Sequence, residues 1–231
     1  GSGKTTLLRA LTGEQPYRGT ALFDGTPISA FSPLDLATRR AVLPQAATVA
    51  FPFTVLELVR LGLTAGLSTG QADDQEALPH KAPARVGLQG YEGRLVQELS
   101  GGERQRAQLA RVLVQIWEPV VEGRARWLLL DEPVSALDIG PQLMIMKLAH
   151  DYARAGGGVI AVMHDLNLTS MFADHVTLLG GGEVHAKGPP EEVLRDHNLS
   201  TCYGCPLRTN TPPPTGRPWI LPQATLMMGA E

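Results

Sequence analysis

The chain has 231 residues, of which 43% are hydrophobic and 19% charged, which is ordinary for a globular protein large enough to form one sizeable domain. Its formal net charge of -3 gives no electrostatic reason to expect a nucleic-acid partner, because such proteins usually carry a marked basic excess. No apolar run approaches the ~20 residues that a membrane-spanning helix needs, so we expect the chain not to cross a bilayer.

The first half of the chain predicts short elements between loops. Apolar residues recur at helical spacing in 4–12 and again in 54–61, so both segments are expected to be helices. Short strands are expected at 19–25 and 41–44, and a loop at 63–75, which is rich in Gly, Ser, Thr and Asp. Residues 76–88 have helical character, but Pro79 and Pro83 are expected to interrupt it.

The second half alternates helices with apolar strands. Residues 127–130 are a continuous apolar run ending at Asp131 and Glu132, as in a strand that is buried on both faces. The other expected elements are helices at 101–116, 139–154, 165–173 and 190–196, a strand at 158–163, and a hairpin at 176–185. The alternation predicts an α/β fold with a largely parallel sheet, followed from Pro206 by an extended Pro-rich tail.

A Gly-rich segment lies at the start of the chain. Gly1-Ser2-Gly3-Lys4-Thr5-Thr6 matches the end of the phosphate-binding pattern G-x-x-x-x-G-K-[ST]. Glycines let backbone N–H groups close around phosphates, and the following helix points its N-terminal dipole at them. Lys4 would reach the β- and γ-phosphates of a nucleotide, and the Thr5 hydroxyl would ligate Mg²⁺. Six residues are a weak match alone, because Gly-Ser-Gly is also common linker sequence.

Two carboxylates follow the buried strand. Asp131, at the tip of the strand, is suited to holding the Mg²⁺ shell, and Glu132 to polarising the attacking water. An acidic turn at the end of a strand is the alternative interpretation. The motif at 99–106 makes this alternative less favoured than a Mg²⁺ site.

A second phosphate-binding segment is Leu99-Ser100-Gly101-Gly102-Glu103, followed by Arg104-Gln105-Arg106. Small residues at a helix start leave several N–H groups available for a phosphate. This segment would compete with the first for the same γ-phosphate, so the two make sense together only if Ser100, Gly101 and Gly102 serve the nucleotide of a second copy. The segment resembles the signature sequence of ABC ATPases.

The resemblance runs from Gly1 to about Gly204 and implies a P-loop NTPase core, with a mostly parallel sheet and a small helical subdomain. It implies further roles for three residues: Gln45 approaches Mg²⁺ and the water, Asp138 of Ser135-Ala136-Leu137-Asp138 lies at the nucleotide, and His164 contacts the γ-phosphate. The implied domain is 1–204, with the helical subdomain inserted at about 50–112 and a tail at 205–231.

The spacing of the motifs narrows the kind of ABC protein. The interval from Gln45 to Ser100 holds a compact subdomain, not the long coiled coil of DNA-repair relatives, and the single set of motifs differs from translation-factor relatives. Phe51-Pro52-Phe53-Thr54 lies where transporter subunits bind their membrane partner, although core packing explains one of the two phenylalanines equally well. The segment His164-Asp165-Leu166-Asn167-Leu168 resembles importers of iron chelates, cobalamin and haem. The segments 51–54, 123–127 and 137–139 and the Pro-rich tail are most similar to the ATPases of haem importers.

The resemblance therefore implies an ATPase that uses ATP and Mg²⁺ to energise haem import. Its partners would be a second copy in a head-to-tail dimer, two membrane permease subunits and, indirectly, a periplasmic solute-binding protein, with no nucleic acid. It would lie peripherally on the cytoplasmic face of the bacterial inner membrane. A ferric-siderophore or cobalamin importer, a soluble regulatory ABC ATPase and an inactive remnant stay open as alternatives.

Two features depart from the family's pattern or lie outside it. The first part of the phosphate-binding loop, the strand before it and an adenine-stacking aromatic residue are missing, so we expect an N-terminally truncated chain that binds ATP weakly as given. Cys202 and Cys205 form a lone C-x-x-C, and no second pair completes a zinc site. We expect two unpaired thiols.

Overall fold

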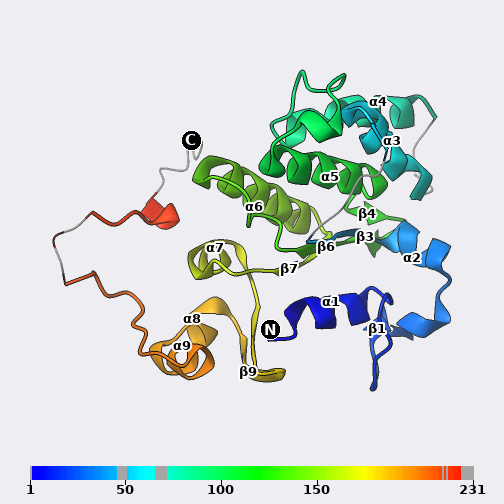
Figure 1. Cartoon of the computed structure of the whole chain (residues 1–231). Helices are drawn as coiled ribbons and strands as arrows, with labels where there is room; N and C mark the ends of the chain where they lie inside the picture. Colours follow the sequence, from blue (N-terminus) through cyan, green and yellow to red (C-terminus); the bar gives the residue numbers. More distant parts are fainter. Residues whose placement is uncertain (1, 46–50, 66–71, 215, 217, 225–231) are drawn as a thin grey trace. The chain divides into compact units, whose positions relative to one another are not determined.

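The computed structural model describes residues 2–45, 51–65, 72–214, 216 and 218–224. The chain divides into two compact units, one of residues 5–162 and one of residues 1–4 together with 163–231, and each is described by itself (Figure 1). Among the helices of the described residues, none is both long and apolar enough to span a membrane.

A three-stranded parallel sheet forms the centre of the larger unit. Its order is β3 (Arg40–Leu43), β6 (Trp127–Asp131) and β7 (Gly158–Val162). Leu43 lies opposite Leu130, and Asp131 lies opposite Val162. The parallel arrangement predicted from the buried apolar runs is confirmed, and it brings the carboxyl ends of all three strands to one edge.

Helices cover both faces of this sheet. Alternation along the strands points Leu129 and Val162 to one face, where they pack against Leu8 of α1 (Lys4–Leu11). Leu128 and Leu130, which are fully buried, point to the other face, where α5 (Gly101–Gln115) and α6 (Ile139–Arg154) lie (Figure 1). The helices predicted at 4–12, 101–116 and 139–154 are confirmed to within a residue.

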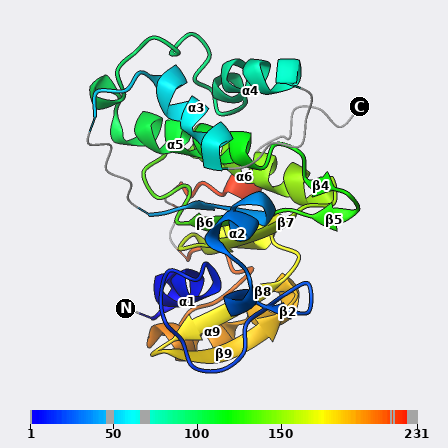
Figure 2. The ribbon, with the colours of Figure 1, turned by 90° about the vertical axis from the view of Figure 1, so that its right-hand side faces the viewer.

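A group of three helices packs together in the same unit: α3 (Val55–Ala65), α4 (Ala72–Arg85) and α5 (Figure 2). The interruption expected at Pro79 and Pro83 is wrong, because α4 continues through both. Each proline removes one backbone hydrogen bond, but a spacing of four residues puts both losses on the same side of the helix. Both rings are buried, so packing outweighs the lost bonds. The loop expected at 63–75 is also shorter than predicted, and residues 66–71 lie outside the described ones.

Short elements connect the larger ones. The strand expected at 19–25 is instead a hairpin of β1 (Leu22–Phe23) and β2 (Thr26–Pro27), because Asp24 and Gly25 both adopt positive φ and turn the chain. The sequence analysis did not predict η1 (Ile28–Ala30), α2 (Pro33–Arg39), η2 (Val96–Glu98), β4 (Val120–Val121) or β5 (Arg124–Ala125).

The smaller unit contains α7 (Leu166–Phe172) and the predicted hairpin, β8 (Val176–Gly180) and β9 (Glu183–Gly188). The single last helix expected at 190–196 is wrong: α8 (Pro190–Val193) is followed by a separate α9 (Asp196–Tyr203). Six residues on a straight helix turn by about 240°, so one helix would point Val193 and Leu199 apart. The break lets both enter the core of this unit.

The tail after Gly204 has no α-helix or strand within its described residues. It ends there in a short turn of 3₁₀ helix, η3 (Pro222–Ala224), where the Gln223 side-chain amide donates to Asn167 Oδ1 at 3.1 Å. Cys202 is half-buried and Cys205 exposed, and both carry free thiols.

Candidate functional site

The sheet brings Thr5 and Asp131 together. Asp131 shares the alternation of Leu129 and so points to the face that α1 covers, while Thr5 lies in the first turn of that helix. Thr5 Oγ1 donates a hydrogen bond to Asp131 Oδ1 at 3.1 Å, although the two residues are 126 positions apart in the sequence. Asp131 is only 3% exposed. The contact is the one expected between a phosphate-binding helix and a carboxylate at the end of a buried strand.

The pair fits the chemistry of Mg²⁺. Mg²⁺ binds oxygen ligands octahedrally at about 2.1 Å, so adjacent ligand oxygens lie about 3 Å apart. The hydroxyl and carboxylate oxygens of the pair are 3.1 Å apart. In the part of the chain that the structure describes, no three His, Cys, Asp or Glu side chains gather as a metal cage. A site with few protein ligands, completed by substrate oxygens and water, is typical of Mg²⁺.

The start of the phosphate-binding segment belongs to the smaller unit. Lys4 Nζ donates to Ser2 Oγ at 2.6 Å, so the ammonium group is held within its own segment. Gly3 has a backbone φ of 86°, which residues with a Cβ rarely adopt. A Cβ on Gly3 would lie 4.0 Å from the Cα of Gly182 in the β8–β9 hairpin. Thr6 is exposed, and Gly1 lies outside the described residues.

Glu132 has an unusual backbone conformation, with φ of 53°. A residue other than glycine in this left-handed region costs about 1–3 kcal/mol and persists only where its surroundings hold it. Here the Glu132 N–H donates to Val162 O at 3.1 Å, and its carbonyl accepts from Gln105 Nε2 at 2.8 Å and from Ser135 Oγ at 3.2 Å. Such strain is concentrated at functional sites, which supports the role expected for Glu132.

Gln45 and His164 are the other two residues expected to act in catalysis. Gln45 is exposed and lies two residues after β3, at the same sheet edge as Asp131, because Leu43 is paired with Leu130. Residues 46–50, which follow it, lie outside the described ones. His164 is exposed and belongs to the smaller unit. The next residue, Asp165, caps α7 by accepting from the N–H groups of Asn167 and Leu168.

The second phosphate-binding segment starts α5. Ser100 caps the helix: its Oγ accepts from Glu103 N at 3.3 Å, and the Glu103 carboxylate accepts from Ser100 N at 2.8 Å. Hydrogen bonds from the Ser100 backbone and hydroxyl lower the pKa of Glu103, so this carboxyl is ionised near neutral pH. Ser100 and Gly101 are exposed, and Gly102 is half-buried. Asp138 takes the equivalent capping position of α6, but its side chain makes no capping bond.

An exposed aromatic pair precedes α3. Phe51 is 68% exposed, and its ring centroid is 6.1 Å from that of Phe53, which is half-buried. Gln97 Nε2 donates to Phe51 O at 2.9 Å and so fixes the segment. The Phe51 ring is thus largely on the surface, and the Phe53 ring is partly covered.

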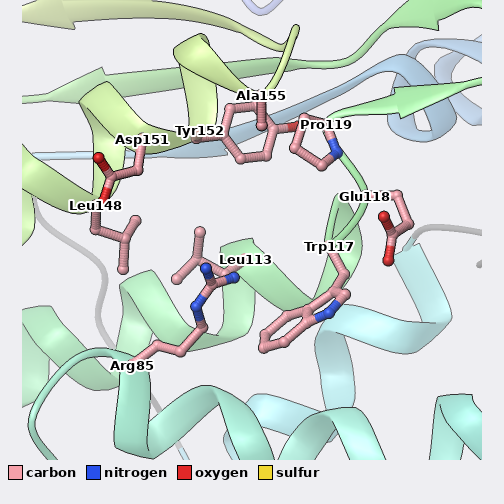
Figure 3. A pocket seen from close by; sticks show the side chains of 9 residues that line it. All are labelled: Arg85, Leu113, Trp117, Glu118, Pro119, Leu148, Asp151, Tyr152 and Ala155. Carbon is pink, nitrogen blue, oxygen red and sulfur yellow. The ribbon is translucent and has the colours of Figure 1, made fainter.

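A cavity of about 250 Å³ lies among α4, α5, α6 and residues 117–119 (Figure 3). It contains none of the predicted site residues, and three of its polar side chains have partners within the chain. The Arg85 guanidinium lies over the Trp117 ring at 4.9 Å, Tyr152 Oη donates to Ile116 O at 3.2 Å, and Asp151 pairs with Lys147. Burial raises the pKa of Tyr152 above its ordinary value, so its hydroxyl stays protonated.

The sequence analysis did not single out Gln105. A glutamine near the start of an amphipathic helix carries no periodic signal, and only the fold brings its amide to the Glu132 carbonyl. Lys4 and His164, by contrast, were predicted but belong to a different compact unit from Asp131 and Glu132.

Comparison with known proteins gives concordant matches. The profile of the ABC transporter family matches residues 1–135. The hemin import ATP-binding protein HmuV of Jannaschia sp. (strain CCS1) is 61% identical over 229 residues, which cover 99% of this chain and 83% of the relative. The protein of the same name from Roseobacter denitrificans is 57% identical, and the match covers 97% of this chain and 84% of the relative.

Solved structures share the fold. CbiO1 of Clostridium perfringens, part of the ABC transporter complex cbiONQ, superposes with a TM-score of 0.65 at 25% identity, over 87% of this chain and 78% of its own. An inward-facing metal-chelate type ABC transporter gives a TM-score of 0.68 at 24% identity, over 89% and 75% of the two chains.

Proposed function

This chain belongs to the ABC transporter family, and on that premise we propose that it is the ATP-hydrolysing subunit of an importer that carries haem. The observation that carries the proposal is the 61% identity, over 99% of the chain, to a protein named for hemin import. The contact between Thr5 and Asp131 supports the ATPase part independently, because a nucleotide site with Mg²⁺ requires these two motifs to meet.

The nucleotide's phosphates would be held at the start of α1. Lys4 supplies a cation for the β- and γ-phosphate oxygens, together with the backbone N–H groups of Gly1, Ser2, Gly3, Thr5 and Thr6. Thr5 and Asp131 would hold Mg²⁺, with Gln45 as a further oxygen ligand, and the ion would neutralise charge on the β- and γ-phosphates. The 3.1 Å separation of the Thr5 and Asp131 oxygens supports this assignment.

Glu132 is the proposed general base. It follows Asp131 directly, and its carboxylate would accept a proton from the water that attacks the γ-phosphate. The family resemblance assigns His164 to the γ-phosphate and Gln45 to the same water. The strained backbone of Glu132 supports this assignment because the surrounding hydrogen bonds stabilise one conformation of this residue.

The proposed assembly contains two copies of this chain and two permease subunits. Ser100, Gly101 and Gly102 of one copy would bind the γ-phosphate held by the other, with Asp138 close to that nucleotide. The exposure of the helix start at Ser100 and Gly101 supports this arrangement. Phe51 would pack against a permease segment, because an exposed aromatic side chain is a common anchor of protein interfaces. We place the subunit on the cytoplasmic face of the membrane and the helical subdomain at α3, α4 and α5.

The test uses the complete transporter in proteoliposomes that enclose ATP and Mg²⁺, with the solute-binding protein and haem outside. We expect haem-dependent ATP hydrolysis and haem uptake, and we expect Glu132→Gln to abolish both while ATP binding remains. Hydrolysis without haem stimulation, combined with stimulation by a ferric siderophore or cobalamin, would contradict the haem assignment but leave the ATPase assignment in place. Turnover of Glu132→Gln within a few-fold of the parent would contradict the role of Glu132.

A further inference from the structure

The first two turns of α5 contact the segment after β6 at two points. Gln105 Nε2 donates to Glu132 O at 2.8 Å. At Gly102, one turn before Gln105, an added Cβ would lie 3.0 Å from Ala136 O, a tight contact that glycine avoids. Gly102 and Gln105 are three residues apart and therefore lie on one face of the helix. That face of α5 packs against Glu132 and the residues that follow it, up to Ala136.

The Gln105 amide is committed to this contact. Its Nε2 makes the shortest of the hydrogen bonds to the Glu132 carbonyl, since Ser135 Oγ is at 3.2 Å and Ser135 N at 3.4 Å. Its Oε1 is buried and accepts no hydrogen bond from the residues that the structure describes. The side chain is thus oriented by one polar partner, the backbone of Glu132.

The carbonyl that Gln105 binds belongs to a residue with φ of 53°. A strained backbone relaxes unless its surroundings hold it, and relaxation at Glu132 would rotate the peptide groups on either side of the side chain. The carboxylate would move with them. Catalytic groups are sensitive to such shifts, because a displacement of about 1 Å can reduce a rate on the order of a hundredfold.

We propose that Gln105 is a positioning residue that holds Glu132 in the conformation needed for ATP hydrolysis. The proposal rests on the proposed function, in which Glu132 is the general base. Gln105 touches neither the nucleotide nor the water and acts only through the Glu132 carbonyl. The start of α5 therefore has two functions: the backbone of Ser100, Gly101 and Gly102 serves the nucleotide of a second copy, while the Gln105 side chain and the Cα of Gly102 face the catalytic segment of their own chain.

The test compares two glutamines of the same helix. Gln115 Nε2 also donates to backbone carbonyls, but to those of Ala37 at 2.9 Å and Arg40 at 3.1 Å, which do not belong to the catalytic segment after β6. Each is replaced by Met, which keeps the length of the side chain and removes the donor. In the complete transporter, we expect Gln105→Met to lower kcat at least tenfold with the KM for ATP within twofold of the parent. Gln115→Met should shift the midpoint of thermal unfolding by a similar amount but leave kcat within twofold.

A second arm separates positioning from general damage. If Gln105 acts through Glu132, Gln105→Met should lower the residual turnover of Glu132→Gln by less than twofold, because residues that act as a unit are not additive. Equal losses of kcat in Gln105→Met and Gln115→Met would overturn the proposal, as would a full tenfold loss in the Glu132→Gln background. A normal rate for Glu132→Gln itself would instead overturn the proposed base, so the two failures are distinguishable.

Discussion

Ser100 has two expected roles: it caps α5, and it binds the γ-phosphate held by a second copy. The two roles can be separated by substitution, because the larger unit contains another serine, Ser32, that has only the capping role. Ser32 caps α2 with the geometry that Ser100 uses at α5: its Oγ accepts from Asp35 N at 3.1 Å, and Asp35 bonds back to Ser32 N at 3.3 Å. No motif places Ser32 near a nucleotide. Replacing either serine by Ala removes one cap, but only Ser100→Ala would also remove a proposed phosphate ligand.

The two losses differ in size. Loss of a capping side chain costs about 1 kcal/mol of unfolding free energy, which is about 2–4 °C in the midpoint for a chain of this size. Both variants should show this shift. A hydrogen bond to a charged group contributes about 1.5–3 kcal/mol, so its loss from the transition state should lower turnover by roughly 10- to 150-fold. That loss is expected for Ser100→Ala alone.

The assay pairs thermal unfolding of the isolated chain with steady-state ATP hydrolysis by the complete transporter. We expect equal unfolding shifts and unequal turnover, with Ser32→Ala within twofold of the parent. Ser100→Gly adds a check, because glycine caps nearly as well as serine, so stability should recover while turnover stays low. If both Ala variants lost turnover equally, Ser100 would be a capping residue only and the second-copy arrangement would lose its main support.

Three further outcomes are expected. Gly158→Ala should lower the unfolding free energy by about 1–3 kcal/mol, measured by chemical denaturation, because the added methyl would overlap the Trp127 ring. Hydrogen bonds from Ser100 lower the pKa of Glu103, so their stabilisation is complete above its ordinary value of 4.5 and is lost as pH falls through the lower folded-state value. The thermal midpoint of the parent should therefore drop more steeply below pH 4.5 than that of Glu103→Gln. Phe51→Ser should leave the midpoint unchanged but reduce co-purification with the permease, because this exposed ring contributes little to the chain's own core.

Long, strongly patterned elements could be predicted from the sequence. The apolar run of β6 and the periodic α5 and α6 carry enough local signal to define type and position. The wrong predictions concern elements whose length and ends are determined by tertiary packing. α4 keeps its helix through Pro79 and Pro83 because both are buried among neighbouring helices, and α9 separates from α8 so that Val193 and Leu199 reach one core. Neither outcome is visible in local propensity.

The site divides in a similar way. Motifs that carry a fixed spacing and chemistry predicted Thr5, Asp131 and Glu132, and the structure joins the first two at 3.1 Å. The conformation of Glu132 and its contact with Gln105 could not be predicted, because they depend on how α5 packs against the segment after β6. A glutamine side chain becomes informative only when its partner is known.

The capping bond at Ser100 does not prevent this residue from binding a phosphate. A serine hydroxyl offers one donor and two acceptor lone pairs, and the cap consumes a lone pair, by accepting from Glu103 N. The O–H can turn from the Glu103 carboxylate to a phosphate oxygen, while the carboxylate keeps its bond from Ser100 N. The Ser100 oxygen thus keeps the helix start in shape by accepting from Glu103 N, while the Ser100 O–H can donate to a phosphate. A phosphate arriving from a second copy would find N–H groups already oriented by the helix, with no reorganisation of its first turn.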